Sequence, residues 1–318
     1  MILTLTLNPA IDKSAIVDKM ISGKKLRCRN IIREPGGGGI NVSKALKELG
    51  GHSRALFPAG GANGRLLIDM LKRLGITHTA IDAASETRED FTVLEESSRN
   101  QYRFVMPGAP LNETEIQRCL DAVLLSQPIA DIVVASGSLP SGVPDDFLAR
   151  LAEMLKSKGV KLIVDTSGHP LQLAARAGVY LLKPNLSELC SLSDTAMLAE
   201  DEIVDAAQAA IAKSYCEVMV ISMADKGALM VTREASISIP APTVNVLSTV
   251  GAGDSMVAGM VWMLEQKKTL IESACFGVAC GTAATMNAGT QLFRKEDAFR
   301  LYQQLSSEII TSPKSRSK

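Results

Sequence analysis

The chain has 318 residues, and its 34 Lys and Arg balance 34 Asp and Glu, so the formal net charge at pH 7 is zero. Such a chain lacks the field with which globally basic proteins collect nucleic acid or anionic membrane, and no apolar run approaches the ~18–20 residues of a membrane span. The six cysteines and three histidines show no CxxC pair and no metal spacing, and no secretory signal precedes the first strand. We therefore expect a cytoplasmic protein with reduced thiols and with neither a nucleic-acid nor a membrane partner.

Two stretches near the N-terminus, about residues 10–33 and 86–106, differ from the rest of the chain. The second contains residues 91–94 and 101–105, which can pair as antiparallel strands through a polar turn. Such a small sheet cannot bury both faces alone, so we expect a β flap that covers a ligand, a partner subunit or both. Arg88 and Arg103 on this flap are either solvated strand residues or a bidentate clamp for a phosphate.

A run of four glycines, Gly36 to Gly39, leads directly into an amphipathic helical pattern. Glycines such as Gly37 and Gly38 let the backbone approach a ligand closely, and the following helix presents free N–H groups. The run matches neither GxGxxG nor GxxxxGK[ST], and a flexible linker is the alternative. The immediate entry into a helix argues against a linker, and it places Asn41 in the first turn, where it can hydrogen-bond a hydroxyl-rich ligand.

From residue 131 onward, short apolar runs alternate with helical patterns. Strands with four or five consecutive apolar residues are covered on both faces, which predicts a parallel sheet sandwiched by helices. Ligands bind at the carboxyl ends of strands in such sheets, so we expect Asn8, Asp12 and Ser138 at that edge. The predicted strands span about 131–135, 160–165, 179–182 and 217–222, and the predicted helices about 144–158, 170–177 and 201–214, with a short helix from residue 185.

Asn185 and Glu188 stand three residues apart where a strand gives way to a helix. This spacing puts both side chains on one helix face, where they can bind Mg²⁺ through water. Alternatively, Asn185 is an N-cap with Glu188 as its capping-box partner, and the two roles can coexist.

The segment from Ser248 to Met256 places small residues and Asp254 at the start of another apolar helix. Such a helix start aims successive N–H dipoles at one point, as a developing phosphoryl charge requires. Asp254 is either a helix cap or, beside this anion hole, a general base for an attacking hydroxyl. The remaining predicted helices span about 252–265, 270–287 and 295–308, and we expect residues 311–318 to be a disordered basic tail.

The motifs Gly36–Asn41, Lys183–Glu188 and Thr249–Asp254, in this order, resemble those of the PfkB branch of ribokinase-like sugar kinases. The resemblance spans the chain from Leu5 to Gly289, and it is closest to the PfkB-type bacterial 6-phosphofructokinases. It implies a single ribokinase-like α/β domain over residues 1–318. In such a domain a mostly parallel central sheet is sandwiched by helices and carries a small antiparallel β lid, through which the chain forms a homodimer.

The same resemblance implies a role for each matching residue. Asp254 is the general base, and Gly251, Ala252 and Gly253 form the anion hole. The other implied roles are sugar and sugar-phosphate binding by Asp12, Gly37, Gly38, Asn41, Arg88, Arg103 and Ser138, ATP binding by Lys25, Lys183, Asn185, Ser222, Gly227 and Thr249, Mg²⁺ binding through water by Glu188, and K⁺ binding by oxygens of Ser248, Val250, Ala284, Asn287 and Gly289.

The implied activity is ATP-dependent phosphorylation of fructose 6-phosphate to fructose 1,6-bisphosphate with Mg²⁺, and K⁺ as a second cation. Tagatose 6-phosphate kinase and 1-phosphofructokinase activities are alternatives, and a non-catalytic sugar-phosphate sensor is an alternative of another class. The sequence departs from the family pattern at Ala224, where relatives usually have Gly, and at Gln291, where the nearest relatives often carry Arg.

Overall fold

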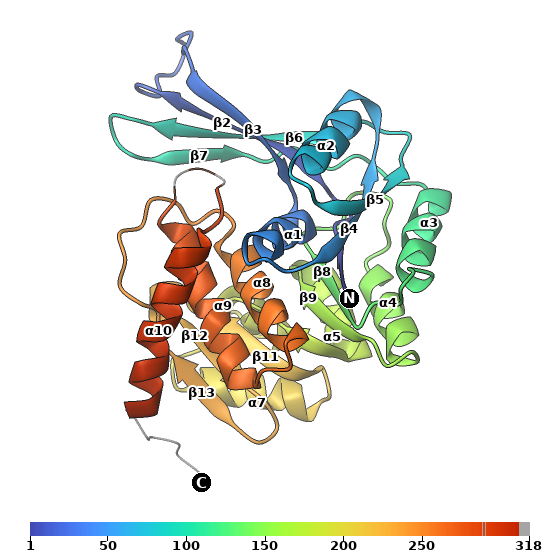
Figure 1. Ribbon diagram of the computed structural model, residues 1–318, viewed down its shortest axis with the longest axis vertical. Coiled ribbons are helices and arrows are strands. Elements are labelled where there is room, and N and C mark those ends of the chain that lie inside the picture. The colour runs from blue at the N-terminus through green and yellow to red at the C-terminus, as the bar shows by residue number, and fades with distance from the viewer. Residues whose placement is uncertain (288, 290, 312–318) are drawn as a thin grey trace.

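The computed structural model describes residues 1–287, 289 and 291–311, and it contains two sheets (Figure 1). The larger sheet is nine-stranded in this part of the chain, with the order β13-β12-β11-β10-β9-β8-β1-β4-β5. Its strands are parallel except that β12 runs antiparallel to β11 and to β13. The strands are β1 (Ile2–Leu5), β4 (Ser53–Ala59), β5 (Thr77–Asp82), β8 (Ile132–Ser136), β9 (Lys161–Asp165), β10 (Val179–Leu182), β11 (Cys216–Ser222), β12 (Ala228–Val231) and β13 (Ser236–Ile239).

The large sheet buries both of its faces, as its apolar runs predict. In β9, Leu162 and Val164 pack into one apolar cluster while Ile163, between them, packs into the cluster on the other face. Side chains alternate between the faces of a strand, so a run of consecutive apolar residues needs helices on both sides. The prediction of a parallel sheet sandwiched by helices is confirmed.

The helices form two layers around this sheet (Figure 1). One layer holds α3 to α7, and the other holds α1, α2, α8, α9 and α10. Their bounds are α1 (Gly38–Glu48), α2 (Gly61–Arg73), α3 (Glu113–Leu124), α4 (Phe147–Lys156), α5 (Gly168–Ala177), α6 (Leu186–Leu192), α7 (Glu202–Ala212), α8 (Ala252–Glu265), α9 (Leu270–Thr285) and α10 (Lys295–Thr311), with a 3₁₀ turn η1 (Ala224–Lys226).

The small sheet stands at one end of the molecule (Figure 1). Its strand order is β3-β2-β6-β7, from β2 (Ala10–Val17), β3 (Arg29–Gly36), β6 (Arg88–Glu95) and β7 (Gln101–Phe104). The predicted antiparallel hairpin is β6–β7, and β2–β3 is also antiparallel, but β2 and β6 pair in parallel. A parallel pair needs a long connection, and here the segment from β3 through β5 supplies it.

The C-terminal helix α10 extends to Thr311, three residues beyond its predicted end. Residue 311, the first of the predicted disordered tail, is thus the last residue of α10, and residues 312–318 lie outside the described part of the chain. Among the described helices, none is both long and apolar enough to span a bilayer.

Candidate active site

Asp254 lies in the first turn of α8, where two side chains hold its carboxylate. The amide Nδ2 of Asn41 donates to Oδ2 at 3.0 Å, and the hydroxyl of Ser136 donates to Oδ1 at 3.2 Å. Asn41 comes from the first turn of α1 and Ser136 from the carboxyl end of β8. Three segments distant in sequence therefore converge on one carboxylate. Asp254 is not the helix cap, because the N-cap of α8 is Gly251.

The environment of Asp254 raises its pKa to about 6, from an ordinary value of 3.8. Burial is the main cause, and the negative charge of Asp165 adds to it. The hydrogen bond from Asn41, the charge of Lys183 and the hydrogen bond from Ser136 oppose the shift. A carboxylate with a pKa near 6 is ionised at pH 7, yet it is a stronger base than an ordinary aspartate, as a general base requires.

Lys183 follows β10 and forms a buried ion pair with Asp165 at the end of β9, with 3.1 Å between Nζ and Oδ1. Burial alone would lower the pKa of Lys183, but Asp165 and the more distant Glu188 and Asp254 outweigh it and raise the pKa. Lys183 therefore stays protonated. A Cβ at Gly253 would lie 3.5 Å from its Nζ, so this cation sits beside the start of α8.

The anion hole predicted from the sequence corresponds to the N-terminus of α8. Gly251 is the N-cap in a left-handed conformation, with φ 75°, which favours glycine. The first N–H groups of a helix have no acceptor within it and are free to bind an anion. The N–H of Ala252 is only partly free, because it donates a long hydrogen bond to Thr249 O at 3.4 Å.

Asn185 and Glu188 form the capping box of α6, with both reciprocal bonds at 2.9 Å. Burial raises the pKa of Glu188, while its bond to Asn185 and the charge of Lys183 oppose the rise. The bond from Asn185 N engages only Oε2 of Glu188. The carboxylate can therefore cap the helix and still offer an oxygen to hydrated Mg²⁺, whose preferred ligands are oxygens.

The glycine run is not a linker, because Gly36 ends β3 and α1 begins at Gly38. Gly37 adopts φ 109°, and a Cβ there would lie 2.6 Å from Thr6 Cγ2. A Cβ on Gly38 would lie 2.2 Å from Ser136 Oγ. The run thus lets the start of α1 pack directly against β1 and β8.

Asp12 and Arg88 lie together at the base of the small sheet. Arg88 pairs with Asp90 at 2.9 Å and donates to the carbonyls of Met106 and Asn8, and its Nε is buried without a partner in the described structure. Arg88 is therefore not a solvated strand residue. Burial raises the pKa of Asp12 to about 6, with Lys44 opposing the rise and Asp90 adding to it.

The remaining sugar-phosphate candidates are Ser138, two residues beyond the end of β8, and Arg103, on strand β7 of the small sheet. Ser138 accepts a hydrogen bond from Asn8 Nδ2 at 3.0 Å. Arg103 is exposed on β7, opposite Thr92, and its charge lowers the pKa of Asp12. The structure thus brings Arg88 and Arg103 near Asp12, and it links Ser138 to Asn8, whose carbonyl accepts from Arg88.

The predicted nucleotide loop follows β11. Ser222 forms an isolated parallel bridge with Asn185, which ties the loop to the start of α6. Gly227 has φ 92°, and a Cβ there would lie 2.1 Å from Ile239 O, so only glycine fits. Ala224 adopts φ 52°, in the left-handed region, where glycine is unstrained.

Replacing Ala224 with Gly is expected to raise the free energy of unfolding by about 1 kcal/mol, because a Cβ disfavours the left-handed conformation. Urea denaturation measures the change. Ala235→Gly is the matched control, since Ala235 lies outside the left-handed region and the same substitution should destabilise there by roughly 0.5–1 kcal/mol. A loss of stability at position 224 would contradict the expectation.

The residues predicted to bind K⁺ gather where the chain leaves α9. The hydroxyl of Ser248 donates to Gly289 O at 2.9 Å and accepts from Val250 N at 3.2 Å, while Asn287 N donates to Ala284 O at 3.2 Å. Lys25, which the sequence predicts to contact ATP, does not lie near these residues in the chain. It is exposed on the loop between β2 and β3. Within the described residues no group of three or more His, Cys, Asp or Glu side chains could hold a metal ion.

Sequence reasoning assigned no role in the site to Ser136 or Asp165. Both are the last residue of a parallel strand, at the edge where ligands bind, so their position was an available signal. Nothing in the sequence, however, shows that Ser136 reaches Asp254 or that Asp165 reaches Lys183.

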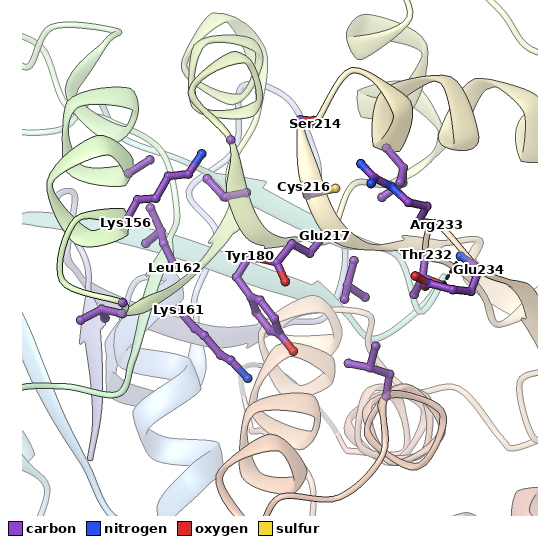
Figure 2. Close-up of a pocket in the computed structure, with 18 residues that line it drawn as sticks. Lys156, Lys161, Leu162, Tyr180, Ser214, Cys216, Glu217, Thr232, Arg233 and Glu234 are labelled. Carbon is purple, nitrogen blue, oxygen red and sulfur yellow. Dashed lines mark hydrogen bonds between the residues drawn. The ribbon is translucent and has the colours of Figure 1, made fainter.

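A cavity of about 640 Å³ lies at the opposite edge of the large sheet, where β9, β10 and β11 begin (Figure 2). Lys156, Lys161, Tyr180 and Glu217 are among the residues that line it. It contains none of the predicted site residues, and the strands separate it from Asp254. The cavity therefore takes no part in the site described above.

Comparison with known proteins agrees with this geometry. The model of the pfkB family of carbohydrate kinases matches residues 5–297. The chain is 42% identical over 306 residues to ATP-dependent 6-phosphofructokinase isozyme 2 of Escherichia coli K12, covering 96% of this chain and 99% of that protein. It is 34% identical to 1-phosphofructokinase of Xanthomonas campestris, covering 85% and 86%.

Solved structures give the same result. Crystal structures of phosphofructokinase-2 from Escherichia coli with potassium and with fructose 6-phosphate superpose with TM-scores of 0.92 and 0.90, at 41% and 40% identity. Each covers 96% of this chain and 99% of that chain. A tetrameric inhibited form of the same protein superposes with a TM-score of 0.90, at 40% identity and the same coverage.

Proposed function

Because the chain belongs to the pfkB family of carbohydrate kinases, we propose that it transfers the γ-phosphoryl group of ATP to the C1 hydroxyl of fructose 6-phosphate. The products are fructose 1,6-bisphosphate and ADP. The observation that carries the proposal is the Asp254 carboxylate, held by Asn41 and Ser136 beside the N-terminus of α8 and Lys183.

The geometry supports phosphoryl transfer at this site. The C1 oxygen of the sugar attacks the γ-phosphorus in line, the bond from that phosphorus to the β,γ-bridging oxygen breaks, and its electron pair stays on ADP. Asp254 accepts the proton of the C1 hydroxyl. The N–H groups of Gly251, Ala252 and Gly253 at the start of α8 stabilise the charge on the transferring phosphoryl group.

The base of the small sheet recognises the sugar phosphate in this proposal. Asp12, Gly37, Gly38 and Asn41 contact the sugar hydroxyls, since hydroxyls are donors to a carboxylate and the glycines allow close approach. Arg88, Arg103 and Ser138 hold the 6-phosphate. The buried Nε of Arg88, which has no partner in the described structure, supports an anionic ligand there.

ATP lies, we propose, along the loop after β11 and the start of α8. Lys183, Asn185, Ser222, Gly227 and Thr249 contact it, and Lys25 reaches the nucleotide of a partner protomer. Glu188 holds Mg²⁺ through water, and the ion when bound neutralises the charge of the phosphates. A K⁺ ion near the anion hole would use oxygens of Ser248, Val250, Ala284, Asn287 and Gly289, in keeping with the potassium complex of the E. coli relative.

The substrate is tested by comparing kcat/KM for fructose 6-phosphate, tagatose 6-phosphate and fructose 1-phosphate. We expect fructose 6-phosphate to be preferred. An equal or higher value for tagatose 6-phosphate would overturn the choice of hexose, and a preference for fructose 1-phosphate would favour the activity of the X. campestris relative. Binding of the sugar phosphate without turnover would favour the sensor.

The small sheet, in our proposal, is the lid of a single kinase domain and also its dimer interface, in a cytoplasmic protein whose six cysteines are free thiols. Large apolar side chains are exposed on its strands β3 and β7 and just beyond, which an isolated protomer in water would not favour. These residues are Ile31, Ile32, Tyr102, Phe104, Val105 and Met106.

The double substitution Phe104→Asp, Val105→Asp is expected to weaken dimerisation by roughly a hundredfold, because charges replace apolar side chains at the interface. Light scattering at micromolar concentration measures the mass. Leu125→Asp is the control, because Leu125 is 71% exposed at the end of α3, away from the small sheet. A wild-type monomer under the same conditions would contradict the proposed interface.

A further inference from the structure

Ser136 is a buried hydroxyl at the carboxyl end of β8, with 5% of its surface exposed. Its Oγ donates to Oδ1 of Asp254 at 3.2 Å, while Asn41 binds the other oxygen. The two donors come from different elements, so together they fix both the position and the rotation of the carboxylate plane.

The contact depends on a close approach between α1 and β8. A Cβ on Gly38 would lie 2.2 Å from Ser136 Oγ and 2.8 Å from Gly137 N. Gly38 does not adopt the left-handed conformation. A glycine is needed at this position because a side chain would clash with β8, and not because of the backbone conformation. The absence of a side chain at position 38 therefore leaves room for the Ser136 hydroxyl.

We propose that Ser136 is a positioning residue that holds the Asp254 carboxylate in the orientation for proton transfer. The inference rests on the proposed function of Asp254 as general base. Asn41 is also placed to contact the sugar, so its amide is shared between two tasks. The Ser136 hydroxyl is buried against Gly38 and donates to Asp254.

The charged and polar groups that face Asp254 set the direction of the effect. Asp165 raises the pKa of Asp254, and Asn41, Lys183 and Ser136 lower it. A hydroxyl that donates to a carboxylate favours the ionised form. Its removal therefore raises the pKa of Asp254 and leaves less of the base ionised at a given pH.

Ser136→Ala tests the proposal, with Ser138→Ala as the matched comparison two residues away. For Ser136→Ala we expect kcat to fall by roughly tenfold, the size of a hydrogen bond to a charged group, with KM for fructose 6-phosphate within about twofold. The acid limb of the kcat profile should move to higher pH. For Ser138→Ala we expect a raised KM and an unmoved acid limb.

Unchanged kcat and an unmoved acid limb in Ser136→Ala would overturn the proposal, as would a rise in KM alone. Thermal unfolding of both variants shows whether either loses structure. A ¹³C NMR titration of the Asp254 carboxyl in wild type and Ser136→Ala needs no substrate, so it tests the contact even if fructose 6-phosphate proves to be the wrong acceptor. An identical titration in the two proteins would exclude the role of Ser136.

Discussion

Asp254→Asn is expected to lower kcat by roughly 10²–10⁴-fold, the usual contribution of a general base. The amide is nearly isosteric with the carboxylate but cannot accept the C1 proton. Its oxygen can still accept from Asn41 and its NH₂ can donate to Ser136, so the site should keep its shape. We therefore expect the affinity for fructose 6-phosphate to stay within about tenfold, which is about 1.4 kcal/mol. Initial rates and equilibrium binding together measure the two effects.

The pH dependence of kcat in the wild-type enzyme tests the same role of Asp254. The pKa of Asp254 is about 6, so kcat should fall as the pH drops through that value and the base becomes protonated. In Asp254→Asn the residual rate should lack this limb. A variant that keeps most of its activity, or keeps the same acid limb, would show that another group takes the proton.

Asp254 should also reduce stability at neutral pH. Its pKa in the folded state lies above the ordinary value of 3.8, so between about pH 4 and pH 6 the folded protein binds more protons than the unfolded chain. Stability through this group is therefore greatest below pH 4 and is lost as pH rises through 6. Asp254→Asn should accordingly melt at a higher temperature than wild type at pH 7.5, and the difference should shrink at pH 4.

Lys183→Met is expected to have the second largest effect. Lys183 and Asp165 have side chains only 6% and 15% exposed, so removal of the cation leaves a buried carboxylate without its partner. Breaking such a pair destabilises by about 3–5 kcal/mol. The variant also loses the cation beside the start of α8, and we expect kcat/KM for ATP to fall by more than tenfold. Urea denaturation and steady-state kinetics measure the two changes.

The double variant Lys183→Met, Asp165→Asn separates the two roles of Lys183. Removing both charges should restore much of the stability, because no unpaired buried charge remains. It should not restore kcat/KM for ATP, since the cation is still absent. Recovery of ATP kinetics in the double variant would show that Lys183 acts only through the fold.

Much of the architecture could be predicted because it follows from the spacing of hydrophobic residues along the sequence. The run at residues 160–165 needed cover on both faces, and β9 has it. The segment Ala252–Glu265 became α8 with the bounds expected from its apolar pattern. Pairing between distant strands has no such local signal. The antiparallel strands β12 and β13 at the edge of the large sheet, and the parallel register of β2 with β6, therefore appeared only in the structure.

The candidate site, too, could be predicted from the sequence only where a local pattern marked it. Asp254 stood out in the sequence because small residues and a helix start surround it. Its contacts with Asn41 and Ser136 had no such signal, since these residues lie 213 and 118 residues away and only the folded chain brings them to its two oxygens. Asp165 was likewise hidden as the last residue of an apolar strand. Side-chain contacts across the sheet edge are set by tertiary packing, to which no local pattern corresponds.

Transfer of a phosphoryl group from ATP to the C1 oxygen of fructose 6-phosphate is tested most directly by ³¹P NMR of the reaction mixture. We predict that the γ-phosphate signal of ATP is replaced by a second sugar phosphomonoester signal at C1, in equal amount to the ADP formed, with the C6 signal retained. Release of inorganic phosphate without a new C1 ester, or no loss of ATP with Mg²⁺ and fructose 6-phosphate present, would contradict the account.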